Sequence, residues 1–88
     1  MHSMYDSRGF AKSNLRKYQE ALEDFTKAVN INSRNPRALC HRAETLALMA
    51  RYSEAYTDAL MALKIDPDYP RAGRLKDRLE MHGSVSRI

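Results

Sequence analysis

One stretch decides the fold, and it occurs twice: YQEALEDFTKAVNI at residues 18–31 and YSEAYTDALMALKI at residues 52–65. The two copies start 34 residues apart and share Tyr, Glu, Ala, Asp, Ala and Ile at matching places. Laying residues 2–35 on 36–69 adds one more identity, Arg8 with Arg42, for a total of seven. Average composition would give roughly two identities by chance. A fixed period of this length indicates a helical repeat array.

Each copy has the pattern of two amphipathic helices. Apolar residues in 18–31 follow the i, i+3, i+4, i+7 spacing of a helix, and those in 52–65 do the same. Before them, residues 5–12 and 39–50 show the same spacing, with a break around 15–17 in the first copy. The start of the second copy, Pro36-Arg37-Ala38, recurs as Pro70-Arg71-Ala72. The sequence therefore predicts two helix pairs and a closing helix over 70–82, with Gly83 as its C-cap.

Small residues at matching positions indicate where helices approach one another closely. They are Gly9, Ala21 and Ala28 in the first copy and Ala43, Ala55 and Ala62 in the second. We expect the larger rings of Tyr18, Phe25 and Tyr52 to fill the wider gaps. The repeated carboxylates Glu20 and Glu54, and Asp24 and Asp58, are predicted to lie on the outside of the second helices.

Composition sets limits on the class of protein. The chain has 88 residues, 43% hydrophobic and 30% charged, which suits one small globular domain and excludes a large enzyme core. Its single cysteine excludes an intramolecular disulfide framework. No apolar run reaches the roughly 20 residues that cross a bilayer, and no secretory signal is recognisable. We therefore expect a soluble, cytoplasmic protein without a membrane partner.

The net charge of +4 is uneven along the chain. Residues 1–35 carry +2, residues 36–69 carry −1 and residues 70–88 carry +3. The basic excess at the C-terminal end can favour acidic partners there. A charged, solvated helix explains it equally well.

The repeats resemble the tetratricopeptide repeat (TPR) family, whose 34-residue helix–turn–helix unit has small residues at fixed places. The resemblance rests on residues 18–31, Tyr52-Ser53-Glu54-Ala55 and residues 62–67. It implies an all-α, α-solenoid fold of about five helices. Repeat one covers 2–35, repeat two 36–69 and a capping helix 70–82, in a single domain over 2–82 with a flexible tail at 83–88. Ser33, Ala59 and Lys12 depart from the residues usual in the family.

Similarity to this family implies a non-catalytic protein-interaction module that binds a peptide or partner segment in a concave groove lined by the first helix of each repeat. The predicted groove residues are Asp6, Phe10, Ser13, Asn14, Arg37, Cys40, His41, Glu44, Leu48, Arg71, Arg74, Leu75 and Arg78. Arginine side chains there suit the carboxylates of an acidic peptide, because the guanidinium can bind them with two parallel hydrogen bonds. The alternative is that these arginines only solubilise the surface.

Co-chaperones of this family grip acidic chaperone tails through a Lys/Asn/Asn/Lys/Arg clamp. In this chain the clamp positions hold Asp6, Phe10, His41, Arg71 and Leu75. Only Arg71 keeps the charge, so we expect no conventional chaperone-tail binding. A rearranged clamp that uses Arg74 and Arg78 stays open.

Other chemistries find little support in the sequence. Cys40 and His41 are adjacent, so on a helix they point about 100° apart and cannot easily share a metal ion. We expect no catalytic residue, no metal, no cofactor and no small-molecule substrate. Nucleic acid is a weaker alternative, because no basic motif with stacking aromatics is present.

Two expectations concern the ends of the chain. An uncovered first helix can stack on a second copy, so a homodimer, or a self-associating fragment of a larger scaffold or enzyme, is an alternative. The last residues, Ser86-Arg87-Ile88, resemble a PDZ ligand and, faintly, a peroxisomal address. Both signals are only three residues long.

Overall fold

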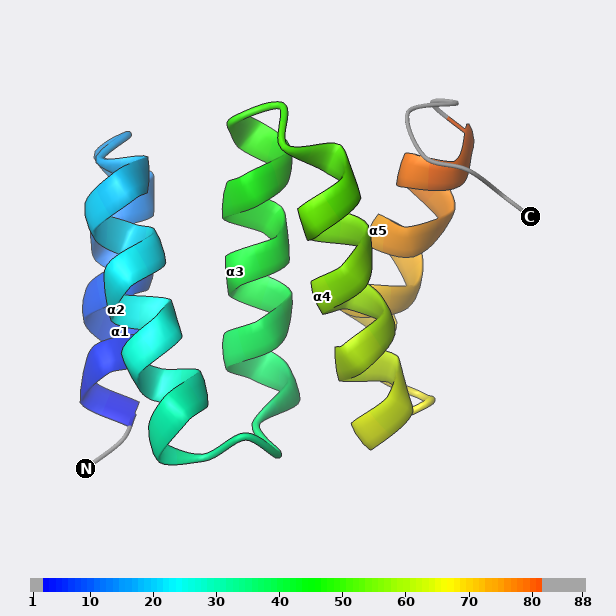
Figure 1. Cartoon of the computed structure of the whole chain (residues 1–88), viewed down its shortest axis with the longest axis horizontal. Coiled ribbons are helices and arrows are strands. Elements are labelled where there is room, and N and C mark those ends of the chain that lie inside the picture. The colour runs from blue at the N-terminus through cyan, green and yellow to red at the C-terminus, as the bar shows by residue number, and fades with distance from the viewer. Residues whose placement is uncertain (1–2, 82–88) are drawn as a thin grey trace.

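Five helices make up the computed structural model, which describes residues 3–81 apart from the side chains of Ser3, Met4 and Asp6. The helices are α1 (Ser3–Asn14), α2 (Tyr18–Ile31), α3 (Pro36–Leu48), α4 (Tyr52–Ile65) and α5 (Pro70–Met81). The predicted all-α fold of two helix pairs and a closing helix is confirmed (Figure 1). The expectations for Gly83 and for residues 82–88 lie outside the described residues.

Helices that follow one another in the chain pack side by side as antiparallel pairs (Figure 1). Only α3 contacts all four other helices within residues 3–81, and it lies between the α1–α2 pair and the α4–α5 pair. The first helix of each pair also contacts the next one, α1 with α3 and α3 with α5. These three helices therefore form one continuous face.

The turn inside each repeat has the same backbone geometry. At the end of α1, the Lys17 amide donates to the carbonyl of Lys12 and the Arg16 amide to that of Ser13, both at 2.9 Å. The same two bonds close α3, from Arg51 to Leu46 and from Ala50 to Ala47. This pattern, a Schellman motif, needs one residue with positive φ, which is usually glycine. Here Arg16 and Ala50 take that position, each with φ 63°.

Polar residues mark the junctions between helix pairs. The Asn35 side chain accepts hydrogen bonds from the backbone amides of Arg37 and Ala38, at 3.1 and 3.2 Å, and so caps α3. Pro36 occupies the first turn of α3, where no amide donor is needed, as the sequence predicted. Asn32 and Asp66 end α2 and α4 at positions 34 residues apart.

Alanine and glycine allow the close packing that their spacing predicted. The alanines at the repeat positions, 21, 28, 43, 55 and 62, are all fully buried. A Cβ placed on Gly9 would lie 2.8 Å from the ring of Phe25, so only glycine fits there without movement. Phe25 is buried, whereas Tyr18 and Tyr52 are only partly covered.

The prediction for the repeated aspartates is wrong, because Asp24 and Asp58 are buried rather than outside. Arg8 contacts Asp24 through two hydrogen bonds of 3.1 and 2.9 Å, and Lys12 adds an ion pair at 3.1 Å. Arg42 binds Asp58 in the same way, at 2.7 and 3.0 Å. A buried carboxylate needs such a partner. Each pair therefore joins the two helices of one repeat, and the hydrogen bond from Arg8 lowers the pKa of Asp24.

Candidate functional site

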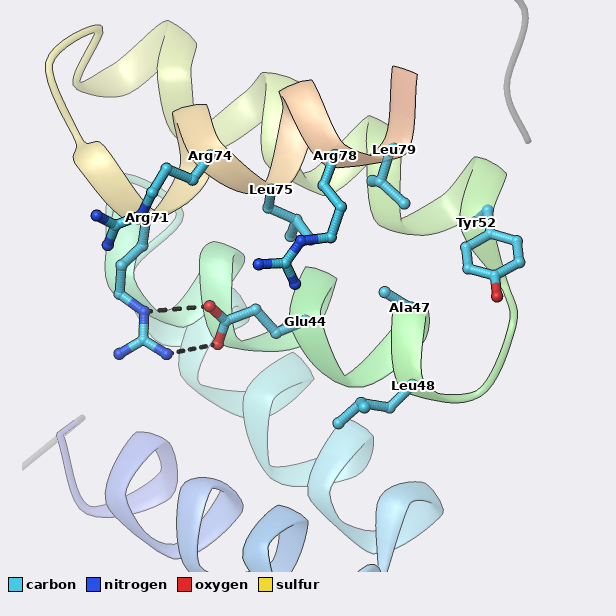
Figure 2. Close-up of a pocket in the computed structure, with 9 residues that line it drawn as sticks. All are labelled: Glu44, Ala47, Leu48, Tyr52, Arg71, Arg74, Leu75, Arg78 and Leu79. Atoms are coloured by element: carbon cyan, nitrogen blue, oxygen red, sulfur yellow. Dashed lines mark hydrogen bonds and ion pairs between the residues drawn. The ribbon is translucent and has the colours of Figure 1, made fainter. Parts of the chain in front are cut away.

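A cleft of about 580 Å³ lies between α3 and α5, with Tyr52 of α4 at one end (Figure 2). We call it the α3–α5 cleft. It is basic along α5 and apolar deeper down. The residues that line it are Glu44, Ala47, Leu48, Tyr52, Arg71, Arg74, Leu75, Arg78 and Leu79.

A second cleft, of about 370 Å³, continues along the same face toward α1. We call it the α1–α3 cleft. Its lining residues are Ser7, Phe10, Arg37, His41 and Arg71. Because Arg71 borders both clefts, they adjoin, and together they form what we call the groove.

Most of the predicted groove residues do line one of the two clefts. They are Phe10, Arg37, His41, Glu44, Leu48, Arg71, Arg74, Leu75 and Arg78. Asn14 is exposed but borders neither cleft, and Ser13 lies 3.5 Å from the hydroxyl of Thr45. Asp6 belongs to α1, but its side chain lies outside the described part of the chain. That these residues bind a partner stays a prediction.

Cys40 is not available to a ligand in this structure. Its side chain is fully buried in a cluster with Ala38, Leu39 and Ala72, because its side of α3 faces the core and not the cleft. Burial raises the pKa of its thiol to about 12, and the nearby Glu44 carboxylate adds to the effect. The thiol therefore stays protonated and unreactive at neutral pH.

Three residues of the α3–α5 cleft, Ala47, Tyr52 and Leu79, were not predicted as groove residues from the sequence. Leu79 belongs to the core cluster that includes Leu46 and Leu75, and Ala47 and Tyr52 pack against that cluster. The sequence predicts only a gap-filling role for Tyr52. That these side chains border the cleft depends on how α4 and α5 cross α3, which local periodicity does not encode.

The charges of the groove are mostly positive. Arg71 binds Glu44 across the α3–α5 cleft with two hydrogen bonds, from Nε at 3.1 Å and from Nη2 at 2.9 Å (Figure 2). Attraction to the Glu44 carboxylate raises the pKa of Arg71. Within residues 3–81, Arg74 and Arg78 have no ion-pair partner. Figure 2 shows Arg78 reaching from α5 toward α3.

An aromatic cluster supports the α1–α3 cleft. The ring of His41 contacts the rings of Phe10 and Phe25, with centroids 5.2 and 5.6 Å away and ring planes tilted by 33° and 51°. Phe25 is buried in the core while Phe10 is exposed. Two tilted aromatic contacts therefore position His41, at the place where the chaperone-tail clamp has an asparagine.

Among the described residues, no three His, Cys, Asp or Glu side chains come together as a metal site would require. No helix within residues 3–81 is long and apolar enough to span a membrane.

Comparison with known proteins identifies the fold's family. The tetratricopeptide repeat family model matches residues 2–35. The structure superposes on the TPR domain of Arabidopsis OM64 with a TM-score of 0.88 and 32% identity, over 92% of this chain and 67% of that one. The chain belongs to the tetratricopeptide repeat family. TPR domains are protein-interaction modules, and the resemblance predicted from the sequence is confirmed.

Two further matches show the range of relatives. The second TPR of Spaghetti (RPAP3), a structure bound to the HSP90 peptide SRMEEVD, superposes with a TM-score of 0.89 over 92% of this chain and 75% of that one. It is 22% identical, so this likeness concerns the fold alone. The heat-shock protein cognate (HSC) co-chaperone sgt12 of Aspergillus fumigatus is 32% identical over 66 residues, 75% of this chain. The chain spans 19% of sgt12 and 8% of each of the first two curated relatives.

Proposed function

We propose that this TPR module binds an acidic peptide segment of a partner protein in the groove formed by α1, α3 and α5. The observation that carries the proposal is a pair of arginines, Arg74 and Arg78, that have no ion-pair partner within residues 3–81 and lie beside an apolar floor in one cleft. Unpaired guanidinium groups attract carboxylates and bind them with directional hydrogen bonds.

The floor of the cleft adds a second requirement on the ligand. Leu48, which is 62% exposed, and the partly buried Ala47 offer apolar surface, whereas Leu75 and Leu79 beside them are only 5% and 2% exposed. Covering that surface favours binding, because it removes apolar area from water. A ligand that places a Leu or Val side chain on the floor and carboxylates beside α5 satisfies both halves of the cleft.

Acidic chaperone tails are a second candidate, supported by the name of the relative sgt12, a co-chaperone. The clamp positions argue against the conventional mode of tail binding. Phe10, His41 and Leu75 cannot supply the amide and cationic groups of that clamp. Tail binding here would instead have to use Arg71, Arg74 and Arg78.

The test is a fluorescence anisotropy titration of the whole chain at physiological salt, because low salt exaggerates charge effects. Four labelled peptides serve as probes: one with the core Glu-Glu-Leu-Glu-Glu, its Gln-Gln-Leu-Gln-Gln counterpart, and two ending Glu-Glu-Val-Asp, one with a free and one with an amidated C-terminus. We expect binding of the first probe at micromolar concentration and loss of binding with the second.

Variants locate the binding surface. Arg74→Ala and Arg78→Ala should each weaken binding of the acidic probe by about fivefold, the effect of removing one partly exposed charge pair. Lys64→Ala removes an exposed cation on α4, away from both clefts, and is the matched control. Absence of binding by every acidic probe, or equal loss in Lys64→Ala, would contradict the proposal. Binding of the Glu-Glu-Val-Asp peptide only with its free carboxylate would favour the chaperone-tail candidate.

A further inference from the structure

Arg71 stands at the centre of the groove, where the two clefts adjoin. A ligand that runs along the groove therefore has to pass it. Its guanidinium already holds a carboxylate, that of Glu44, in the bidentate geometry that a ligand carboxylate would adopt (Figure 2). The Glu44 side chain is 30% exposed and that of Arg71 is 47% exposed, so water and ligands reach both groups.

The surroundings of Glu44 make it unusual. Among the described residues that line the two clefts, it is the only acidic one, and the other charged residues are all arginines. It occupies the position 34 residues after Phe10 and 34 before Arg78, so the equivalent places of the other two helices hold no carboxylate. The pair with Arg71 thus does not arise from the repeat. It is particular to this contact between α3 and α5.

From these contacts we infer that Glu44 is a built-in competitor for ligand carboxylates at Arg71 and so sets the selectivity of the groove. The inference rests on the proposed function, since it assumes an acidic ligand. With Glu44 in place, an incoming carboxylate meets Arg74 and Arg78 directly but has to displace Glu44 to reach Arg71. It also approaches a negative charge, which repels it. A weakly acidic segment therefore gains little binding free energy, whereas a segment with several carboxylates gains enough to offset the displacement of Glu44.

Exposed ion pairs contribute little to folding stability. The Glu44–Arg71 pair can therefore open at small cost, and removal of Glu44 is compatible with a folded domain. This property makes the competitor testable by substitution. The buried pairs of Asp24 and Asp58 are different, because loss of either pair would disturb the fold.

The experiment compares wild type with Glu44→Gln in the same anisotropy titrations. Glutamine keeps the size of the side chain but loses the negative charge. We expect about fivefold tighter binding of the Glu-Glu-Leu-Glu-Glu probe and no change for its glutamine counterpart. The gain should shrink as the salt concentration rises, because screening weakens the repulsion.

Two further variants check the mechanism. The gain should disappear in the double variant Glu44→Gln, Arg71→Ala, since no freed guanidinium is then present. Glu54→Gln is the matched control, because Glu54 also forms an exposed bidentate pair, with Arg51 at 2.6 and 2.7 Å, but on no wall of the groove. It should leave binding of both probes unchanged. Thermal unfolding monitored by circular dichroism verifies that all variants are folded.

The outcomes separate this inference from the proposed function. If wild type binds the acidic probe through Arg74 and Arg78 while Glu44→Gln binds it equally or more weakly, the competitor role is wrong and the groove assignment stands. Tight binding by Glu44→Gln together with weak binding by wild type supports the competitor role. If neither protein binds any acidic probe, both the inference and the proposed function are overturned.

Discussion

Repeat one and repeat two make the same helix-to-helix contact with different side chains. In repeat one, Gly9 leaves space that the ring of Phe25 fills. The equivalent places of repeat two hold Ala43 and Ala59, which belong to one buried cluster with leucines 75 and 79 of α5. The period of 34 residues therefore fixes the positions of contacts, while the volume at each contact is shared differently among neighbours. A repeat sequence predicts where helices touch more readily than which side chain fills the space.

The buried Arg–Asp pairs differ in the same way. The Arg8 side chain, paired with Asp24, is 48% exposed, whereas that of Arg42, paired with Asp58, is only 19% exposed. Arg42 also donates a hydrogen bond to Thr26 of the preceding repeat, at 3.3 Å. The second pair thus links two repeats, and the first pair links only the helices of its own repeat.

The largest expected effect follows from this difference. Asp58→Ala leaves the largely buried Arg42 charge without its carboxylate, which should lower the free energy of unfolding by about 3 kcal/mol. Asp24→Ala should cost less, because Arg8 can turn into water and Lys12 is released with it. Urea unfolding monitored by circular dichroism measures both. Equal losses would mean that exposure of the arginine does not decide the cost.

The glycine contact gives the next largest effect. Gly9→Ala places a methyl group 2.8 Å from the Phe25 ring, so the ring or α1 must move, at a cost of about 1–3 kcal/mol. Gly73→Ala is the matched control. No atom lies within 4 Å of a Cβ added there, so better helix propensity should stabilise the domain by up to about 1 kcal/mol. Thermal unfolding of the two variants should show shifts of opposite sign, and a stabilising Gly9→Ala would show that the contact is loose.

The smallest expected effect concerns the shared turn. Ala50 has φ 63°, a conformation that costs an L-residue about 1 kcal/mol, and glycine removes most of this cost. Ala50→Gly should therefore stabilise the domain by about 0.5 kcal/mol after the loss of chain entropy is included. The same change at the exposed helical residue Ala11 should destabilise it by about 1 kcal/mol. The midpoints of denaturant unfolding, compared between variants with equal m-values, measure both changes in stability. A destabilising Ala50→Gly would contradict the strain argument.

Much of the fold could be predicted from the sequence because the period is strong. The five helices, the break at residues 15–17 and the N-terminal place of Pro36 all follow from local spacing and turn chemistry. The burial of Asp24 and Asp58 did not follow, since a charged residue is ordinarily outside. A signal was present, however. Arg8 and Arg42 recur with the same separation of 16 residues from their aspartates.

The candidate site was less predictable. The family resemblance, with helical spacing, placed His41, Glu44 and Leu48 on one face of α3, and all three border the clefts. It misplaced Cys40, which lies one position before His41 but about 100° around the helix, toward the core. Neither the Glu44–Arg71 pair nor the part played by Tyr52 was predicted, because both depend on the crossing of separate helices.

The central place of α3 has a consequence for how the domain fluctuates. Helices that contact few neighbours open more easily than those enclosed on all sides, and amide hydrogen exchange reports such opening. Within residues 3–81, α5 contacts only α3 and α4, whereas α3 is held by four helices. Glu44 thus lies on α3, the firmly packed side of the groove. Arg74 and Arg78 lie on α5, a helix that opens more readily. A ligand that binds both α3 and α5 would hold the two helices together, and it would slow amide hydrogen exchange in α5 more than in α3.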